Sequence, residues 1–178
     1  LDSKEWATDY NEIKDCGGLK SAKRTAQQTE TARFWLVAGP VAYHPFLRYL
    51  ATAKAMDVVE SARFMALAAI AINDALISVL DAKYHYNFWR PVTAIRNGDS
   101  DGNPATDREA TWQPIADTPM HPEYPCAHCT VSGSVAGVVR AVLGTDDIPE
   151  IGITSPTATG LTHRWTNMGA FTREVANA

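Results

Sequence analysis

The sequence predicts an all-helical fold, and three stretches of the chain carry the prediction. Residues 45–86 are rich in alanine and have no internal glycine or proline, which is typical of helices. Residues 128–143 include several small side chains that allow a neighbouring helix to approach closely, and Gly144 ends this stretch. Thr166 can cap a last helix over residues 167–178.

The first 60 residues contain recognisable helix ends. Ser3 and Ser21 are suitable N-caps for two short helices, with a stop and turn at residues 16–18, Cys-Gly-Gly. Asp57 is followed three residues later by Glu60, a spacing typical of a capping box. A second helical segment should therefore begin there.

The helix after Asp57 is expected to be central and mostly buried. Its apolar residues follow helical spacing but occupy most of the circumference. They include Ala62, Met65, Ala66, Ala69, Ile72, Leu76 and Leu80.

Residues 97–125 and 144–165 read as long loops rich in proline and glycine. A loop of the first one's length in a compact domain is usually functional or disordered. With 178 residues, of which 46% are hydrophobic, the chain can bury one substantial core. We expect a single helical domain over residues 1–178, incomplete at its C-terminus.

Charge and hydropathy exclude several classes of protein. The net charge of -4 gives no uniform basic surface for nucleic acid, so an anion site has to be local. The most apolar run, residues 64–72, is shorter than the ~20 residues of a membrane-spanning helix, and we expect no membrane span. The start of the chain does not resemble a signal peptide, and three cysteines do not settle the redox compartment.

Two cationic residues stand seven positions apart. If the helix continued, Lys83 and Arg90 would point within about 20° of one another. Two cations on one face are costly unless an anion or carboxylates compensate them. A structural alternative is that Lys83 reaches water while Arg90 pairs with a carboxylate.

A histidine follows a proline-rich loop at the start of a predicted helix. Free N–H groups at a helix start bind oxyanions, and His128 would stand there as an acid, base or donor. By itself, such a histidine is more often a cap or a surface residue.

Together these features resemble a known signature. Lys83, six further residues and then Arg90-Pro91 are similar to the first motif of the vanadium-dependent haloperoxidase and type 2 phosphatidic acid phosphatase superfamily. Residues 121–128, His-Pro-Glu-Tyr-Pro-Cys-Ala-His, resemble its second motif, usually Pro-Ser-Gly-His. The likeness continues more loosely through residues 155–166 and 173–178, and it covers the chain from about Leu50.

The resemblance implies a helical bundle of the haloperoxidase and acid phosphatase type, with an oxyanion pocket. Lys83 and Arg90 would bind oxygens of vanadate or phosphate, and Ala127 would offer its backbone N–H. His128 would be the catalytic acid and base. Such donors stabilise a trigonal bipyramidal anion or transition state.

Two departures from the family stand out. Cys126 replaces the usual serine, and a thiol is a weaker donor than a hydroxyl, although Cys126 would still belong to the oxyanion-binding set. The third motif, with an arginine and the histidine that binds vanadium or attacks phosphorus, is not found up to Ala178, and His163 does not replace it. We expect no metal ligand in this chain, and we expect the chain alone to be inactive.

The resemblance implies halide oxidation by hydrogen peroxide at bound vanadate, or else hydrolysis of phosphate monoesters through a phosphohistidine. A binding protein of lectin or storage type that lost the site is the third alternative. Partners would be a small oxyanion with peroxide and halide, or a phosphate ester, and no zinc, heme or nucleotide is expected. The family suggests a secreted or extracytoplasmic location, and a homo-oligomer or association with a cleaved C-terminal piece.

Cys126 and Cys129 also form a Cys-x-x-Cys pair at a helix start, where redox dithiols are found. A thioredoxin-like site would need a preceding strand and a βαβ context. Zinc would need four ligands at paired spacings, which His121, Cys126, His128 and Cys129 do not provide.

Overall fold

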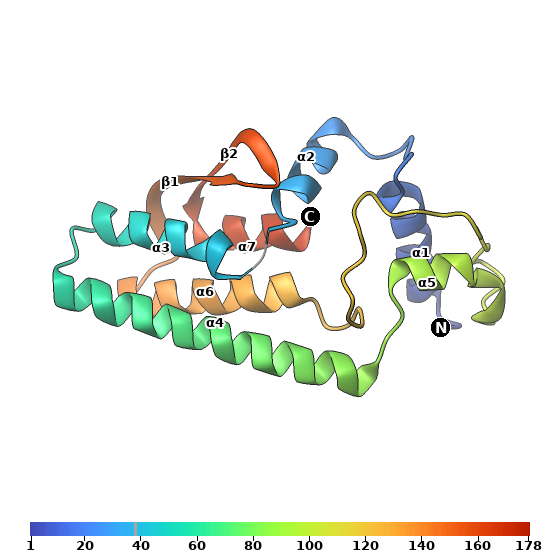
Figure 1. Cartoon of the computed structure of the whole chain (residues 1–178), viewed down its shortest axis with the longest axis horizontal. Coiled ribbons are helices and arrows are strands. Elements are labelled where there is room, and N and C mark those ends of the chain that lie inside the picture. The colour runs from blue at the N-terminus through green and yellow to red at the C-terminus, as the bar shows by residue number, and fades with distance from the viewer. Residues whose placement is uncertain (38) are drawn as a thin grey trace. The chain divides into compact units, whose positions relative to one another are not determined.

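The computed structural model describes residues 1–37 and 39–178. The chain groups into two compact units, residues 1–26 with 82–124 and residues 27–81 with 125–178, and each is described by itself. The expected single domain stays a prediction. In chain order the elements are α1 (Lys4–Gly17), α2 (Ala26–Phe34), α3 (Pro40–Ala53), α4 (Val58–Tyr86), α5 (Pro91–Arg96), the 3-10 turn η1 (Gly98–Ser100), α6 (Ala127–Leu143), β1 (Asp147–Ser155), β2 (Ala158–Asn167) and α7 (Met168–Ala176) (Figure 1).

In the first unit, the proline-rich segment after α5 is held against α1. Tyr10 Oη donates to the carbonyl of Asp107 at 2.8 Å, and Trp112 Nε1 donates to the carbonyl of Lys14 at 3.0 Å. Trp6 Nε1 donates to Asp101 Oδ2 at 2.8 Å. A small buried cluster of Tyr10, Ala94, Ile95 and Trp112 lies beneath these bonds. Side-chain hydrogen bonds to and from α1 therefore hold this segment, which has little regular secondary structure of its own.

The second unit has one main hydrophobic core, to which α3, α4, α6, α7 and both strands contribute. Its largest fully buried side chains are aromatic and aliphatic: Phe34, Tyr43, Phe46, Leu47, Leu50, Phe64, Ile151, Met168 and Phe171. Burial of a side chain of this size contributes about 1.5–3 kcal/mol. Both α6 and α7 are held in the unit through side chains that belong to this core.

α4 begins as the sequence predicts. Glu60 N donates to Asp57 Oδ1 at 2.8 Å, and Asp57 N donates to Glu60 Oε2 at 3.0 Å, so the capping box is confirmed. The expectation of a mostly buried helix is wrong. One stripe is buried, at Phe64, Ala68, Ile72, Ala75, Val79 and Lys83, while large apolar side chains elsewhere are exposed: Val58, Val59, Leu67, Ile70, Ile77 and Leu80.

The stretch Val58–Arg96, which contains α4 and α5, is long and apolar enough to cross a membrane by length and composition, and 28% of its most apolar window is buried. It is longer than the apolar run that the sequence marks, because alanines extend the apolar character beyond residues 64–72. The core helix of a soluble protein meets the same criterion, so this finding is weak evidence for a membrane.

The prediction of a loop over residues 144–165 is wrong, because most of these residues form an antiparallel hairpin. Ile151 pairs with Trp165, Ile153 with His163, and Ser155 with Ala158 across a two-residue turn. The register shifts between Asp147 and Ile151, which accommodates Pro149 where the ladder needs no N–H donor. The fold is thus mostly helical, and all-α is an approximation.

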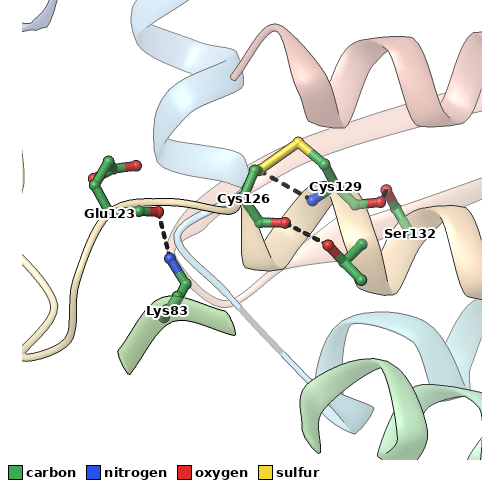
Figure 2. Close-up of a disulfide and its surroundings, with 6 residues drawn as sticks. Lys83, Glu123, Cys126, Cys129 and Ser132 are labelled. Atoms are coloured by element: carbon green, nitrogen blue, oxygen red, sulfur yellow. Dashed lines mark hydrogen bonds between the residues drawn. A yellow bond between two sulfur atoms is a disulfide. The ribbon is translucent and has the colours of Figure 1, made fainter. Parts of the chain in front are cut away.

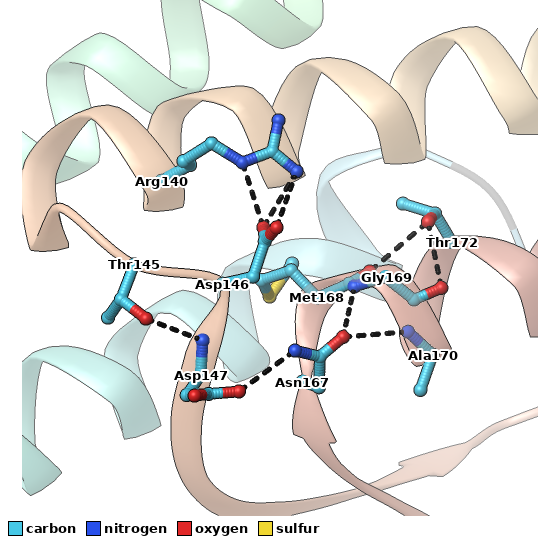
Figure 3. Close-up of polar contacts among 9 residues, drawn as sticks. All are labelled: Arg140, Thr145, Asp146, Asp147, Asn167, Met168, Gly169, Ala170 and Thr172. Atoms are coloured by element: carbon cyan, nitrogen blue, oxygen red, sulfur yellow. Dashed lines mark hydrogen bonds and ion pairs between the residues drawn. The ribbon is translucent and has the colours of Figure 1, made fainter.

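Polar contacts join the end of α6 to the start of α7 (Figure 3). Arg140 Nε and Nη2 each donate to the Asp146 carboxylate at 2.9 Å. Asn167 Oδ1 accepts from the N–H groups of Gly169 and Ala170, so Asn167 is the N-cap of α7 in place of the expected Thr166. Met168 N donates to the carbonyl of Asp146 at 2.9 Å. The hairpin is therefore closed at its base.

Candidate functional site

Lys83 and Arg90 do not share a helix. α4 ends at Tyr86, and Asn87 has a positive φ of 46°, a left-handed conformation that asparagine tolerates better than most residues. Arg90 has extended dihedrals and is the N-cap of α5. The helix does not continue to Arg90, so the condition for an alignment by helical periodicity is not met.

The two cations nevertheless converge on one short segment, residues 121–123, in the first unit. Lys83 lies on the buried stripe of α4 and is only 1% exposed. Its Nζ donates to the carbonyl of Pro122 at 2.8 Å. Nζ also donates to the carbonyl of Glu123, as Figure 2 shows. An ammonium has three N–H donors, so one donor remains beyond these two bonds.

Arg90 makes a denser set of contacts with the same segment. Its Nε donates to the carbonyl of His121 at 2.6 Å, and its Nη1 pairs with Glu123 Oε2 at 2.7 Å. Nη2 lies 2.8 Å from His121 Nδ1. Glu123 N in turn donates to the carbonyl of Phe88 at 3.1 Å, which fixes the segment beside the end of the first motif.

The charges of this cluster do not cancel. Lys83 and Arg90 carry two positive charges and Glu123 one negative charge. Burial lowers the pKa of Lys83, the neighbouring Arg90 lowers it further, and the Glu123 carboxylate opposes these effects. A cluster with excess positive charge and spare N–H donors is suited to an oxyanion.

An open cavity of about 450 Å³ adjoins Arg90 and His121 and is lined also by Trp89, Thr93 and Pro119 among others. Its lining combines a guanidinium and an imidazole with apolar groups. A small anion could thus reach the guanidinium from solvent.

Sequence reasoning did not assign roles to His121 and Glu123. The signal for them was present, since two cations on neighbouring elements call for a carboxylate and Glu123 lies inside the second motif. The structural alternative for Arg90, pairing with a carboxylate, describes the Glu123 contact. The alternative for Lys83 is wrong, because this side chain is buried and does not reach water.

The last residues of the second motif, 125–128, lie in the second unit and open α6. Cys126 is the N-cap, and its Sγ accepts from Cys129 N at 3.2 Å. Cys126 and Cys129 form a disulfide with a Cα–Cα distance of 5.3 Å (Figure 2). Cys126 therefore has no S–H donor in this state, unlike the thiol that the sequence suggested.

Ala127 and His128 occupy the first turn of α6, where N–H groups have no partners within the helix. His128 Nε2 lies 3.2 Å from the carbonyl of Val37. Since a carbonyl only accepts, Nε2 carries a proton, and a neutral ring would have an unprotonated Nδ1. Among the residues that the structure describes, no hydrogen bond to His128 Nδ1 is present, so that atom is available for proton transfer.

His163 is engaged elsewhere in the second unit. Its Nδ1 lies 2.6 Å from Glu174 Oε1, and its ring stacks on Phe34 with centroids 3.9 Å apart. Glu174 also accepts from the indole nitrogens of Trp35 and Trp165. These contacts give His163 a place in the packing of the second unit. Within residues 1–37 and 39–178, no group of three or more His, Cys, Asp or Glu is arranged to hold a metal ion.

The predicted residues therefore fall into two sets. Lys83 and Arg90 meet in the first unit, and Cys126, Ala127 and His128 lie on one helical turn in the second. All residues of each set belong to the same unit.

Comparison with known proteins gives three consistent results. The family model described as the VCPO second helical-bundle domain matches residues 63–178. Vanadium chloroperoxidase from Curvularia inaequalis is 31% identical over 148 residues, which cover 68% of this chain and 24% of that protein. The crystal structure of a bacterial vanadium-dependent iodoperoxidase matches with a TM-score of 0.60 and 22% identity, over 98% of this chain and 36% of that one. The structural match shows a shared fold.

Proposed function

Because the chain belongs to the family of the VCPO second helical-bundle domain, we propose that it is the oxyanion-binding part of a vanadium-dependent haloperoxidase. The chain spans only 24% of the length of its curated relative, so the activity proposed is that of a longer protein. The observation that carries the proposal is the convergence of Lys83 and Arg90 on residues 121–123 with a single carboxylate between them.

Vanadate, when bound, would supply the chemistry that lets hydrogen peroxide oxidise a halide. The chain's own residues have simpler tasks. Lys83 and Arg90 bind anion oxygens, and the bonds from both side chains to residues 121–123 fix their orientation before the ligand arrives. Such preorganisation reduces the cost of reorganising donors around developing charge.

His128 would act as the acid and base. Its Nε2 is held by the Val37 carbonyl, which orients the ring and assigns proton exchange to Nδ1. The N–H of Ala127 would donate to an anion oxygen, as at other helix starts.

Neither reported relative is a phosphatase or a lectin, so the phosphatase and binding-protein alternatives are not favoured. The disulfide is in keeping with an extracytoplasmic location, because disulfides persist in oxidising compartments. That location belongs to the proposal.

Titration of orthovanadate into the 178-residue chain by calorimetry tests the proposal. Saturable binding that inorganic phosphate displaces is expected, and Arg90→Met should weaken it at least tenfold. Absence of binding would refute the proposed function. The same chain should show no vanadate-dependent bromide oxidation with hydrogen peroxide, because the third-motif histidine is not among its residues.

A further inference from the structure

The Cys126–Cys129 pair is unusual in its placement, because it lies in a motif to which we assign anion binding. Cys126 is exposed at the N-cap of α6, whereas Cys129, one turn later, is only half-exposed. The two cysteine residues are therefore unequal in their exposure to solvent.

The turn that carries both cysteines is held by bonds that do not involve sulfur. The carbonyl of Cys126 accepts from Thr130 N at 3.1 Å and from Thr130 Oγ1 at 2.8 Å. Ser132 Oγ donates to the carbonyl of Cys129 at 3.2 Å (Figure 2). The backbone would thus keep the two sulfurs within reach of each other after the disulfide is reduced.

The helix start also favours the reactive form of Cys126. A thiolate at an N-cap is stabilised by the helix dipole and by nearby N–H groups, and Cys129 N already donates to Cys126 Sγ. Among the described residues, Cys126 is the one cysteine that combines a helix N-cap with an exposed side chain, since Cys16 is half-buried near the end of α1.

We propose that Cys126 and Cys129 form a reversible redox site, in which Cys126 reacts with hydrogen peroxide and Cys129 resolves the product. The relevance of peroxide rests on the proposed function, whereas the reactivity itself rests on the geometry of the pair. A dithiol that reaches the disulfide from solvent is the reductant that completes the cycle.

The chemistry balances in two steps. The Cys126 thiolate attacks one oxygen of hydrogen peroxide, the O–O bond breaks, and a sulfenic acid forms while the released hydroxide takes a proton to become water. The Cys129 sulfur then attacks Cys126 Sγ, the S–O bond breaks, and hydroxide leaves as water with the Cys129 proton. Overall, two thiols and one peroxide give a disulfide and two waters. A dithiol reverses the reaction by exchange and becomes a disulfide itself.

The resolving step has a protective consequence. Without a partner thiol, a sulfenic acid is oxidised further to sulfinic and sulfonic acids, which thiols do not reduce. Cys129 would therefore keep an exposed sulfur recoverable in a peroxide-rich site.

The test compares the 178-residue chain with Cys129→Ser, and uses Cys16→Ser as the matched control. Each protein is reduced with dithiothreitol, exposed to hydrogen peroxide, reduced again and examined by peptide mass spectrometry. Wild type and Cys16→Ser should recover Cys126 as a thiol. Cys129→Ser should lose that recovery, with two or three oxygen atoms fixed on Cys126.

Equal irreversible oxidation of Cys126 in wild type and Cys129→Ser would overturn the proposal. A second measurement needs no variant: dithiothreitol without denaturant should open the disulfide of the folded wild type, as shown by maleimide labelling of two additional thiols. Labelling that requires urea would also overturn it. Orthovanadate binding is not a readout in either experiment, so a failure here leaves the proposed function to its own test.

Discussion

The substitution Lys83→Met removes a buried charge from the cation cluster while keeping a side chain of similar length. Lys83 is 1% exposed as a residue, and its ammonium donates to two carbonyls. Its remaining donor is the one that we assign to an anion oxygen. A hydrogen bond to a charged group contributes about 1.5–3 kcal/mol, so orthovanadate affinity should fall roughly 10-fold to 150-fold.

The effect on stability should be much smaller than the number of lost bonds suggests. Two carbonyl acceptors lose a partner, at about 1–3 kcal/mol each. The variant also avoids the cost of burying an ammonium, which is several kcal/mol. Because these contributions oppose each other, we expect the free energy of unfolding to change by less than about 2 kcal/mol.

Calorimetric titration with orthovanadate measures the affinity, and urea denaturation followed by circular dichroism measures the stability. Lys20→Met is the matched control, since Lys20 is an exposed lysine of the same unit and its loss should change neither quantity. An orthovanadate affinity for Lys83→Met within twofold of wild type would refute the assignment of Lys83 to the anion.

Further outcomes are expected at other residues. Burial and Arg90 lower the pKa of Lys83, so Lys83 loses its positive charge at a lower pH than an ordinary lysine. Anion affinity should fall as the pH rises through this lowered pKa. In a calorimetric pH series, Lys83→Arg should abolish that fall. By the same shift the unfolded chain binds more protons, so stability should rise with pH between the lowered pKa and the ordinary lysine value. Glu174→Ala leaves Trp35, Trp165 and His163 without their carboxylate and should cost about 3–6 kcal/mol by urea denaturation, whereas Glu150→Ala, at an exposed ion pair, should cost under about 1 kcal/mol. Cys126→Ser introduces the hydroxyl donor that the family motif usually has. Orthovanadate binding should tighten by about 1 kcal/mol, which is several-fold in affinity. An unchanged affinity would mean that the side chain does not face the anion.

The helices could be predicted where local signals agree. Asp57 and Glu60 predict the start of α4, because a capping box involves only two residues that are three positions apart. Gly144 ends α6, where it has a φ of 73°. The hairpin is not predicted by local rules, because Pro149 and Pro156 are typical of loops and turns. Pro149 is accommodated by an irregular register, and such a register shift arises only when β1 pairs with the neighbouring strand β2.

The sequence proposes residues for the candidate site, whose roles stay a prediction, and it anticipates their geometry only in part. Periodicity did not place Lys83 on the buried stripe of α4, where the structure has it. Nothing local in the sequence showed that Asn87 would take a left-handed conformation and end the helix before Arg90. The cations meet because residues 121–123 return to both of them. That return is a long-range contact, which is why Glu123 and His121 were assigned no role.

The positions of the tryptophans offer a practical means of following each unit. Trp6, Trp89 and Trp112 belong to the first unit, and Trp35 and Trp165 to the second. The second pair shares hydrogen bonds to Glu174, so its fluorescence should report the hairpin and α7, while variants that keep only the first three should report the cation cluster. Spectroscopy on such variants would show whether the chain melts in one transition or two, and whether orthovanadate raises the melting temperature of one set of indoles before the other.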